Sequence, residues 1–427
     1  MTDSTVSQAL VPRRFFYGYV LIGYSFFILF LASSFFLHSR GIFFPLWMED
    51  FDVSRTEISS VVTFTLFTGS CIAPFIGYLI DKYPLRVITT MGSLWLATGY
   101  FLLGYVESYH AFFACLLLFQ SLGWVCIGPL VHTKLMVNWF TRNRGMALGI
   151  AIMGISVAGI VMPTAATFLS DNLGWRGTYS LYAGILVCLF LPLTLLLVKQ
   201  EPSVIGSLPD GDSAGPGDDD PPVQVALPQT TLEVYREFLT SKPFWSVVIT
   251  FTLMNGVYSA LMTHLPAYLT TELSYDLYDA SYVLGTAGGF AIAGKIVFGW
   301  MMDHIDAKGT VLFAVISYFL STIVFIFAES YLLMLLAAGL FGLGFGGMVP
   351  VRSVLLSRIF GIKKFSRVNG LFSFFLAPAT FWVLATGYIT DLSGTYTSAF
   401  KVWAVAFTLA GIVTLIIRLP NREDAVA

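Results

Sequence analysis

The sequence predicts an all-α membrane protein with 12 transmembrane helices, arranged as two parallel pseudo-repeats of six. Three observations predict this fold class: the composition, the number of long apolar runs, and an internal repeat. Of the 427 residues, 56% are hydrophobic and only 11% are charged, whereas a soluble domain has about 25% charged residues. The mean hydropathy is +0.78. A net charge of −2 gives no reason to expect a nucleic-acid partner.

Twelve apolar runs are long enough to span a bilayer, which takes roughly 20 residues in an α-helix. Only helices fit these runs, because backbone groups without a hydrogen-bond partner are costly in lipid. The first six runs cover 17–45, 57–80, 86–106, 109–137, 145–170 and 177–198. The last six cover 244–270, 277–302, 309–328, 331–357, 366–390 and 397–418.

The lysine and arginine residues predict the orientation, because they concentrate on the cytoplasmic side of multi-span proteins. With the N-terminus placed in the cytoplasm, sixteen of the 23 basic residues lie on the cytoplasmic side. Four face the opposite side: Arg40, Arg55, Arg176 and Lys401. Three remain inside predicted spans: Lys134, Lys295 and Arg352. We therefore expect both termini in the cytoplasm, and the short tails suggest a bacterial inner membrane.

One long hydrophilic segment divides the chain. It contains LPDGDSAGPGDDDPP, whose glycine, proline and aspartate content cannot bury a hydrophobic core. The predicted organisation is an N-terminal six-helix bundle over 1–198, a flexible cytoplasmic linker over 199–243 and a C-terminal six-helix bundle over 244–427.

The two halves match each other at an offset of about 220 residues. GYLIDK, from Gly77 to Lys82, aligns with GWMMDH, from Gly299 to His304. SLGWVCIGP aligns with GLGFGGMVP, and FLSDNLG aligns with YITDLSG. Because the copies share order and polarity, the bundles are expected to face each other about an axis along the membrane normal. A binding site would lie between them near the midplane and open to each side in turn.

On these motifs the chain resembles the major facilitator superfamily over nearly its whole length. The superfamily signature between helices 2 and 3 resembles Gly77, Asp81, Lys82 and Arg86 at their spacing here, and a partial copy follows at Gly299 and Asp303. The glycines are expected to let helices pack closely, and the aspartates to hold the cytoplasmic side closed through a neighbouring helix end or basic side chain. The glycine usual after the basic residue is replaced by Pro84.

Other segments resemble the monocarboxylate transporter branch and its bacterial relatives, the oxalate/formate exchangers. They are FFYGY, RGIFFPLWMEDFDVSRTEIS, NWFTRNRGMALGIAIMGISVAG, LGWRGTY and HLPAYLTTEL. The stretches around predicted helices 5 and 6 are the most specific of these.

Lys295 is the leading candidate for substrate binding, because an ionisable residue at bilayer depth costs several kcal/mol and marks a functional site by default. It lies eight residues before Asp303, about 12 Å along a helix, which places it near the midplane. In the resembled family this position is commonly an arginine that binds the substrate carboxylate. Proton-coupled relatives often carry an aspartate one turn earlier, where this chain has Ala291. Pairing of Lys295 with a structural acid is the alternative, but no span core contains one.

His38 is the first choice for a proton site, because histidine changes protonation near neutral pH. The resembled mammalian transporters place a lysine at this position. The alternative is a hydrogen-bonded histidine at the outer end of helix 1.

Three further polar residues are candidate substrate ligands, each with a structural alternative. Lys134 can attract anions along the inner path or extend its amine to the membrane surface. Arg352 can bind a second carboxylate or pair with Asp303 in a gate. Asn255 can hydrogen-bond a substrate hydroxyl or carboxylate, or a neighbouring helix. His264 is expected to be structural.

The predicted function is secondary active transport of small organic anions, by proton-coupled symport of a lactate-like monocarboxylate. The alternatives are exchange of organic anions of the oxalate/formate type and, in a different class, a solute sensor without net transport. No nucleophile–base set or cluster of metal ligands is evident, so no enzyme activity, cofactor or metal is expected. The expected partners are a small carboxylate, a proton and the lipid bilayer, and a monomer suffices.

Overall fold

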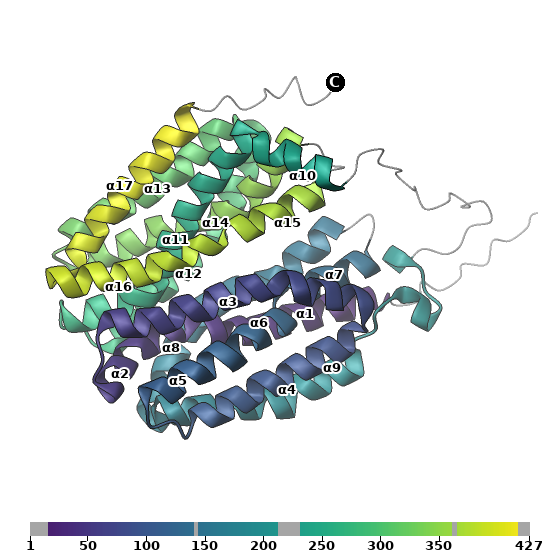
Figure 1. Cartoon of the computed structure of the whole chain (residues 1–427), viewed down its shortest axis with the longest axis horizontal. Coiled ribbons are helices and arrows are strands. Elements are labelled where there is room, and N and C mark those ends of the chain that lie inside the picture. Colours follow the sequence, from purple (N-terminus) through teal and green to yellow (C-terminus); the bar gives the residue numbers. More distant parts are fainter. Residues whose placement is uncertain (1–15, 141–143, 212–230, 361–364, 417–427) are drawn as a thin grey trace, which may run out of the picture.

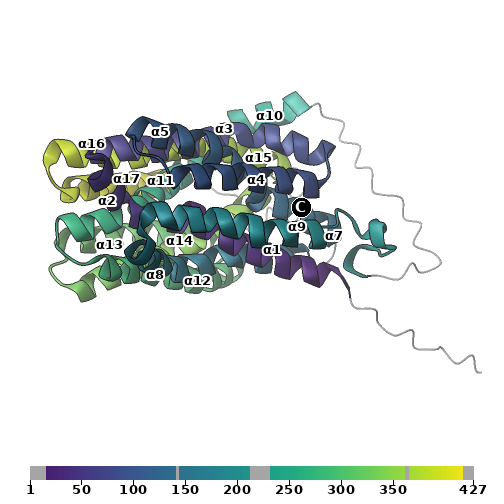
Figure 2. The ribbon, with the colours of Figure 1, turned by 90° about the horizontal axis from the view of Figure 1, so that it is seen from below.

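The computed structural model describes residues 16–140, 144–211, 231–360 and 365–416. Every regular element in these ranges is a helix, and the helices run close to parallel along the long axis of the molecule (Figure 1, Figure 2). The predicted all-α membrane class is confirmed. The side chains of Asp81 and Asp303 are outside the described residues.

The N-terminal half forms one group of helices, drawn from purple to teal in Figure 1. Its elements are α1 (Gly18–Ser33), η1 (Ser34–His38), α2 (Arg40–Phe51), α3 (Arg55–Lys82), α4 (Leu85–Leu103), α5 (Tyr109–Cys115), η2 (Leu116–Gln120), α6 (Ser121–Ile127), α7 (Pro129–Trp139), α8 (Arg144–Ile185), η3 (Leu186–Phe190) and α9 (Leu191–Leu197).

The C-terminal half forms the second group, drawn in green and yellow. Its elements are α11 (Lys242–Thr271), α12 (Leu277–His304), α13 (Ala307–Phe327), α14 (Tyr331–Phe360), α15 (Phe365–Phe375), η7 (Ala377–Thr380), α16 (Phe381–Ser393) and α17 (Tyr396–Ile416). Between the halves lie η4 (Pro202–Ile205), η5 (Pro209–Gly211) and α10 (Thr231–Thr240). The acidic core of the predicted linker falls outside the described residues.

Ten helices of the described chain are long and apolar enough to cross a membrane. One of them, Met146–Leu197, has 52 residues, about twice what a crossing needs. It breaks at Gly174, whose φ of +67° no helix accommodates. The 19-residue α4 lies over the predicted span 86–106. Within the described residues, each of the twelve predicted runs falls mainly on helices, and the structure is consistent with twelve crossings.

Helix 1 was predicted to end at residue 45, which is too early. The chain passes from α1 through the π-helical turn η1 into α2 and remains helical to Phe51. A π-helical turn adds a residue to one helical turn and so rotates all later side chains about the axis. The apolar pattern of the sequence does not reveal this added residue.

Contacts between the two halves gather toward one end of the molecule. There α3 packs against α16, α2 packs against α11, and α8 packs against α12. Gly41 of α2 lies against the carbonyl oxygen of Met262 in α11, where a side chain would not fit. We call this the latch end, and the opposite end, near α10, the linker end (Figure 1).

Candidate functional site

A cavity of about 190 Å³ lies between the halves and contains both leading candidates, Lys295 and His38. We call it the charged lobe. Its walls come from η1 and α8 of the first half and from α11, α12 and α14 of the second. Apart from these two residues and Ser156, the lining is mainly apolar.

Lys295 reaches across the boundary between the halves. Its ammonium donates a hydrogen bond to the hydroxyl of Ser156 on α8. No aspartate or glutamate of the described residues pairs with it or lines the charged lobe. The alternative of a structural acid partner therefore finds no support in this part of the chain. Within the described chain, this half-buried cation is held by one neutral hydroxyl and has no acidic counter-charge.

His38, at the end of η1, packs against the same part of α8. Its Nε2 is 3.2 Å from the carbonyl oxygen of Ile155, the residue next to Ser156. In the neutral form Nε2–H donates to this carbonyl, which leaves Nδ1 as the acceptor. Two successive residues of α8 thus hold both candidate groups in one cavity. The alternative position, at an outer helix end, is wrong, because the helix continues for thirteen residues beyond His38.

Glycines bring α8 and α12 close enough to form this cavity. A Cβ atom on Gly288 would lie 2.6 Å from the carbonyl carbon of Gly159, nearer than real Cβ contacts occur. A Cβ atom on Gly159 would lie 3.0 Å from Cε1 of His38. The His38 ring therefore packs where a side chain at position 159 would stand.

Asn255 lies in a second cavity, of about 350 Å³, also lined from both halves. We call it the neutral lobe. Its polar lining side chains are Thr65, Ser70, Asn255, Ser259, Ser373 and Thr380, and none of its lining residues is charged. The structure therefore separates Asn255 from the charged lobe, although both lobes are lined in part by η1 and α11.

The two other predicted cations line neither lobe. Arg352 lies on α14, where its guanidinium carbon is 5.3 Å from the centre of the Phe372 ring. Its Nε is buried without a hydrogen-bond partner in the described chain. Lys134 lies half-buried on α7, between the lobes and the linker end. The gate between Arg352 and Asp303 falls on a side chain outside the described residues.

The signature residues lie at the linker end. Lys82 is 5.9 Å and 5.7 Å from the ring centres of Tyr78 and Tyr83. Arg86 donates through Nε to the carbonyl oxygen of Val198, at 3.1 Å, and so caps the C-terminal end of α9. The close helix packing expected at Gly77 and Gly299 is absent among the described residues, since a Cβ atom on either would meet nothing within 4 Å. The reason is that the contacts between halves lie toward the latch end here.

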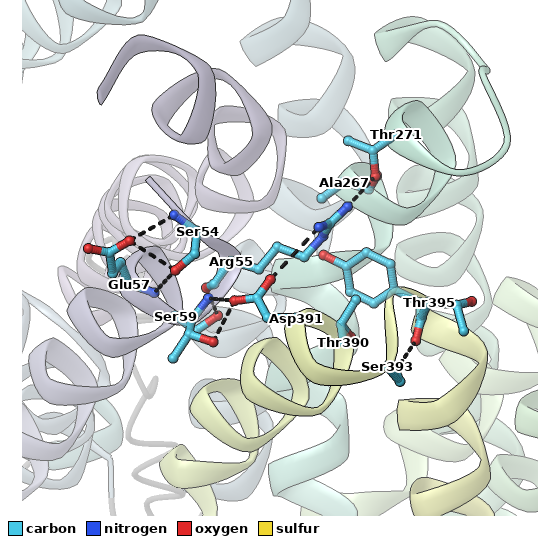
Figure 3. Close-up of polar contacts among 12 residues, drawn as sticks. Ser54, Arg55, Glu57, Ser59, Ala267, Thr271, Thr390, Asp391, Ser393 and Thr395 are labelled. Carbon is cyan, nitrogen blue, oxygen red and sulfur yellow. Dashed lines mark hydrogen bonds and ion pairs between the residues drawn. The ribbon is translucent and has the colours of Figure 1, made fainter. Parts of the chain in front are cut away.

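A polar cluster, which we call the latch, joins the halves at the opposite end (Figure 3). The Asp391 carboxylate of α16 accepts hydrogen bonds from Thr56 N–H at 2.8 Å and Thr56 Oγ1 at 2.6 Å. Asp391 also pairs with Arg55 at 3.8 Å, and Arg55 donates to Thr271 at 3.1 Å. Figure 3 shows the Arg55 side chain between Asp391 and Thr271. Arg55 was predicted to face the outer side, and its contacts show that it also joins the two halves.

The internal repeat gives the latch a counterpart. Asp171, which the repeat aligns with Asp391, lies near the Tyr278 hydroxyl of α12. Thr56 and Tyr278 are themselves related by an offset of 222 residues. Each half therefore places the same aspartate position beside the start of the equivalent helix in the other half.

His264 belongs to the latch rather than to either lobe. Its ring nitrogens lie 3.2 Å from the hydroxyls of Ser59 and Tyr396 and 3.0 Å from the Val383 carbonyl oxygen. The expected structural role fits these contacts. His132 is buried within the N-terminal half, 2.9 Å from the Ser25 hydroxyl.

Arg40 is the residue that sequence reasoning missed. It was predicted to face the outside, but it is only 6% exposed, because the helix continues through this position. Its guanidinium carbon is 5.8 Å from the centre of the Phe36 ring, and its Nε has no hydrogen-bond partner in the described chain. A buried guanidinium without a carboxylate partner is costly. The charge within an apolar helix was the available signal, and its place near the end of the first predicted span, 17–45, concealed it.

Comparison with known families agrees with this architecture. The sequence profile described as Major Facilitator Superfamily matches residues 15–331 and 291–426. The chain belongs to the major facilitator superfamily. It is accordingly a multi-pass membrane transporter, and the predicted resemblance is confirmed.

Several superfamily members are similar to the chain over most of their length. An uncharacterized MFS-type transporter, YcxA of Bacillus subtilis (strain 168), is 22% identical over 405 residues, covering 89% of this chain and 91% of that protein. Monocarboxylate transporter 13 of Rattus norvegicus is 23% identical, covering 89% and 84%. Monocarboxylate transporter 12 of Mus musculus is 25% identical, covering 90% and 82%.

A solved structure of the superfamily shares the fold. The crystal structure of a bacterial homolog to the human lysosomal transporter Spinster, in an inward-facing and unoccupied conformation, superimposes with a TM-score of 0.72. It is 12% identical and covers 94% of this chain and 95% of that one. At this identity the likeness concerns the major facilitator fold alone.

Proposed function

We propose that this protein carries small monocarboxylates across the membrane together with a proton, by alternating access. One observation carries the proposal: the ammonium of Lys295 lies in a cavity between the halves, and within the described residues its hydrogen-bond partner is a neutral hydroxyl, that of Ser156. A cation at this depth is expensive unless a counter-charge completes the site. The relatives named monocarboxylate transporters support a carboxylate as that counter-charge.

His38 is the proposed proton carrier. Its ring lies in the charged lobe and donates to Ile155 when neutral. Protonation of Nδ1 would place a second positive charge beside the bound carboxylate, and the anion would stabilise that charge. Substrate and proton would then bind cooperatively, as symport requires.

The conformation supports alternating access. The latch joins the halves at one end, while the charged lobe lies about midway along α8 and α12. We propose that the linker end is cytoplasmic, that both termini face the cytoplasm of a bacterium, and that the latch closes the outer side. One chain contains both walls of the site, so a monomer suffices.

Uptake of labelled lactate into proteoliposomes tests the proposal. Opposite unit charges about 4 Å apart interact by about 4 kcal/mol at an effective dielectric of 20, so Lys295→Ala should weaken lactate binding by at least 100-fold. Lys295→Arg should keep part of the uptake, because the charge remains. Lys308→Ala is the matched control, since this lysine donates to the Leu415 carbonyl oxygen and lines neither lobe. Unchanged affinity in Lys295→Ala would remove Lys295 from the site.

The same vesicles separate proton symport from its alternative. An inward proton gradient should stimulate lactate uptake, and His38→Ala should abolish that stimulation while preserving part of the binding. Exchange of organic anions is the second candidate, because no carboxylate of the described chain lines the charged lobe to carry a proton. Uptake that requires an anion inside the vesicles and ignores the gradient would favour exchange.

A further inference from the structure

The neutral lobe is the pseudo-symmetric copy of the charged lobe. The offset of 222 residues that relates Gly77 to Gly299 also relates Ala73 to Lys295. Ala73 lines the neutral lobe, as Lys295 lines the charged one. The equivalent of the site lysine is therefore a cavity-lining alanine.

Other wall positions obey the same relation. Three charged-lobe residues of α12 correspond at this offset to three neutral-lobe residues of α3: Ala287, Gly288 and Ala291 to Thr65, Leu66 and Gly69. The aromatic walls correspond as well. Tyr258 stacks on Phe345 at 3.5 Å beside the charged lobe, and Phe36 stacks on Trp124 at 4.4 Å beside the neutral lobe. The lobes are two copies of one cavity with different chemistry.

The neutral lobe offers hydrogen bonds without charge. Asn255 and Ser259 are four residues apart on α11, so their side chains share a face. Neither side chain hydrogen-bonds within the described chain. Thr65 and Ser70 donate to carbonyl oxygens of their own helix, so their hydroxyl oxygens remain free to accept. An amide and several hydroxyls thus face a cavity of about 350 Å³.

The lobes are adjacent. Phe36 lines the neutral lobe, and the next two residues of η1 line the charged lobe. On α11, Tyr258 lines the charged lobe and Ser259 the neutral one. Neighbouring residues of η1 and of α11 therefore separate the two lobes. A ligand whose carboxylate is bound in the charged lobe has the neutral lobe directly beside it.

We propose that the neutral lobe is a second subsite of the same transport site, which receives an uncharged hydrogen-bonding group of the substrate. The inference rests on the proposed function, in which Lys295 binds the carboxylate. The preferred substrate is then a monocarboxylate with a hydroxyl or amide group at its far end. A second carboxylate is disfavoured, because Ala73 stands where a second cation would be and a buried charge without a partner is costly.

Competition against labelled butyrate in proteoliposomes tests the proposal with matched acids. Butyrate, 4-hydroxybutyrate and succinate share one chain length, and hexanoate, 6-hydroxyhexanoate and adipate share a longer one. At one or both lengths the hydroxy acid should compete at least 10-fold better than the plain acid and the dicarboxylate. Asn255→Ala should reduce this preference to 2-fold or less, by weakening the hydroxy acids more than the plain acids. Thr252→Val is the control, because Thr252 lies on the same helix and donates to the Phe375 carbonyl oxygen outside both lobes.

A gain-of-function variant tests the pseudo-symmetry directly. Ala73→Lys restores a cation at the equivalent of Lys295, and it should raise the affinity for succinate or adipate at least 10-fold relative to the hydroxy acid. Ala73→Met, of similar length without charge, should not. If Ala73→Lys does not assemble in the membrane, the Asn255 comparison decides alone.

Failure of this inference is distinguishable from failure of the proposed function. Butyrate uptake that depends on Lys295, with no advantage for hydroxy acids and no effect of Asn255→Ala, would overturn the second subsite alone. Absence of any carboxylate uptake, or uptake unaffected by Lys295→Ala, would overturn both.

Discussion

Removal of the Asp391 carboxylate should open the latch end. Asp391 accepts two hydrogen bonds from Thr56, at 2.8 Å and 2.6 Å, and pairs with Arg55 at 3.8 Å. All three contacts join the two halves, so all three are lost whenever the latch end opens. Their free energy therefore favours the latched conformation alone.

The expected magnitude follows from these contacts. Hydrogen bonds to a charged group contribute about 1.5–3 kcal/mol each, and the lower figure applies because the Asp391 side chain is 24% exposed. The partly exposed ion pair adds at most about 1 kcal/mol. Asp391→Ala should therefore shift the conformational equilibrium by about 3 kcal/mol, on the order of 100-fold. Asp391→Asn, which keeps an acceptor for Thr56, should shift it by less.

The assay measures access to the transport site from the latch side. In a background without the four native cysteines, Ser259→Cys places a thiol in the neutral lobe. Its alkylation by a membrane-impermeant reagent added at the latch side should become at least 10-fold faster in Asp391→Ala. Asp50→Ala is the matched control, because Asp50 pairs with Arg176 at 2.6 Å within one half. Equal alkylation rates with and without Asp391 would refute the latch.

Three further predictions concern the site and its framework. Arg40→Gln should raise the KM for anion uptake from the latch side at least 5-fold, with little change from the linker side. The reason is that the Arg40 guanidinium, whose Nε has no hydrogen-bond partner in the described chain, lies on the latch side of His38. Arg176→Gln is the control, and equal effects on both sides would contradict the prediction. Gly288→Val should abolish uptake while the protein still inserts into the membrane, because the valine side chain would overlap Gly159. The control is Gly289→Ala, where a Cβ atom meets nothing within 4 Å. Normal uptake by Gly288→Val would show that α8 and α12 need not approach closely. Ser54→Ala should lower the stability of the latch-end helix start by about 1 kcal/mol, because Ser54 and Glu57 form a capping box at α3; thermal unfolding in detergent would measure it, and no change in Tm would contradict it.

The sequence determined the parts of this protein that depend on local pattern. Long apolar runs require helices in lipid, so the spans could be placed from hydropathy alone. The repeat could be read because both halves keep glycines and aspartates at matching positions, such as Gly77 and Gly299. Lys295 was visible because a charge inside an apolar helix conflicts with its surroundings, whatever the rest of the fold.

The tertiary structure decided which of these residues meet. The π-helical turn at Ser34–His38 rotates the residues that follow it about the helix axis, and Arg40 is buried. No apolar periodicity signals the extra residue. Asn255 and Tyr258, one helical turn apart on α11, face different lobes, because the boundary between the halves runs along that helix. Arg55 and Asp391 are 336 positions apart in the chain, and their pairing follows only from how the two bundles lean together. Charge and hydropathy are properties of single segments, whereas a site shared by two halves exists only after those halves have packed.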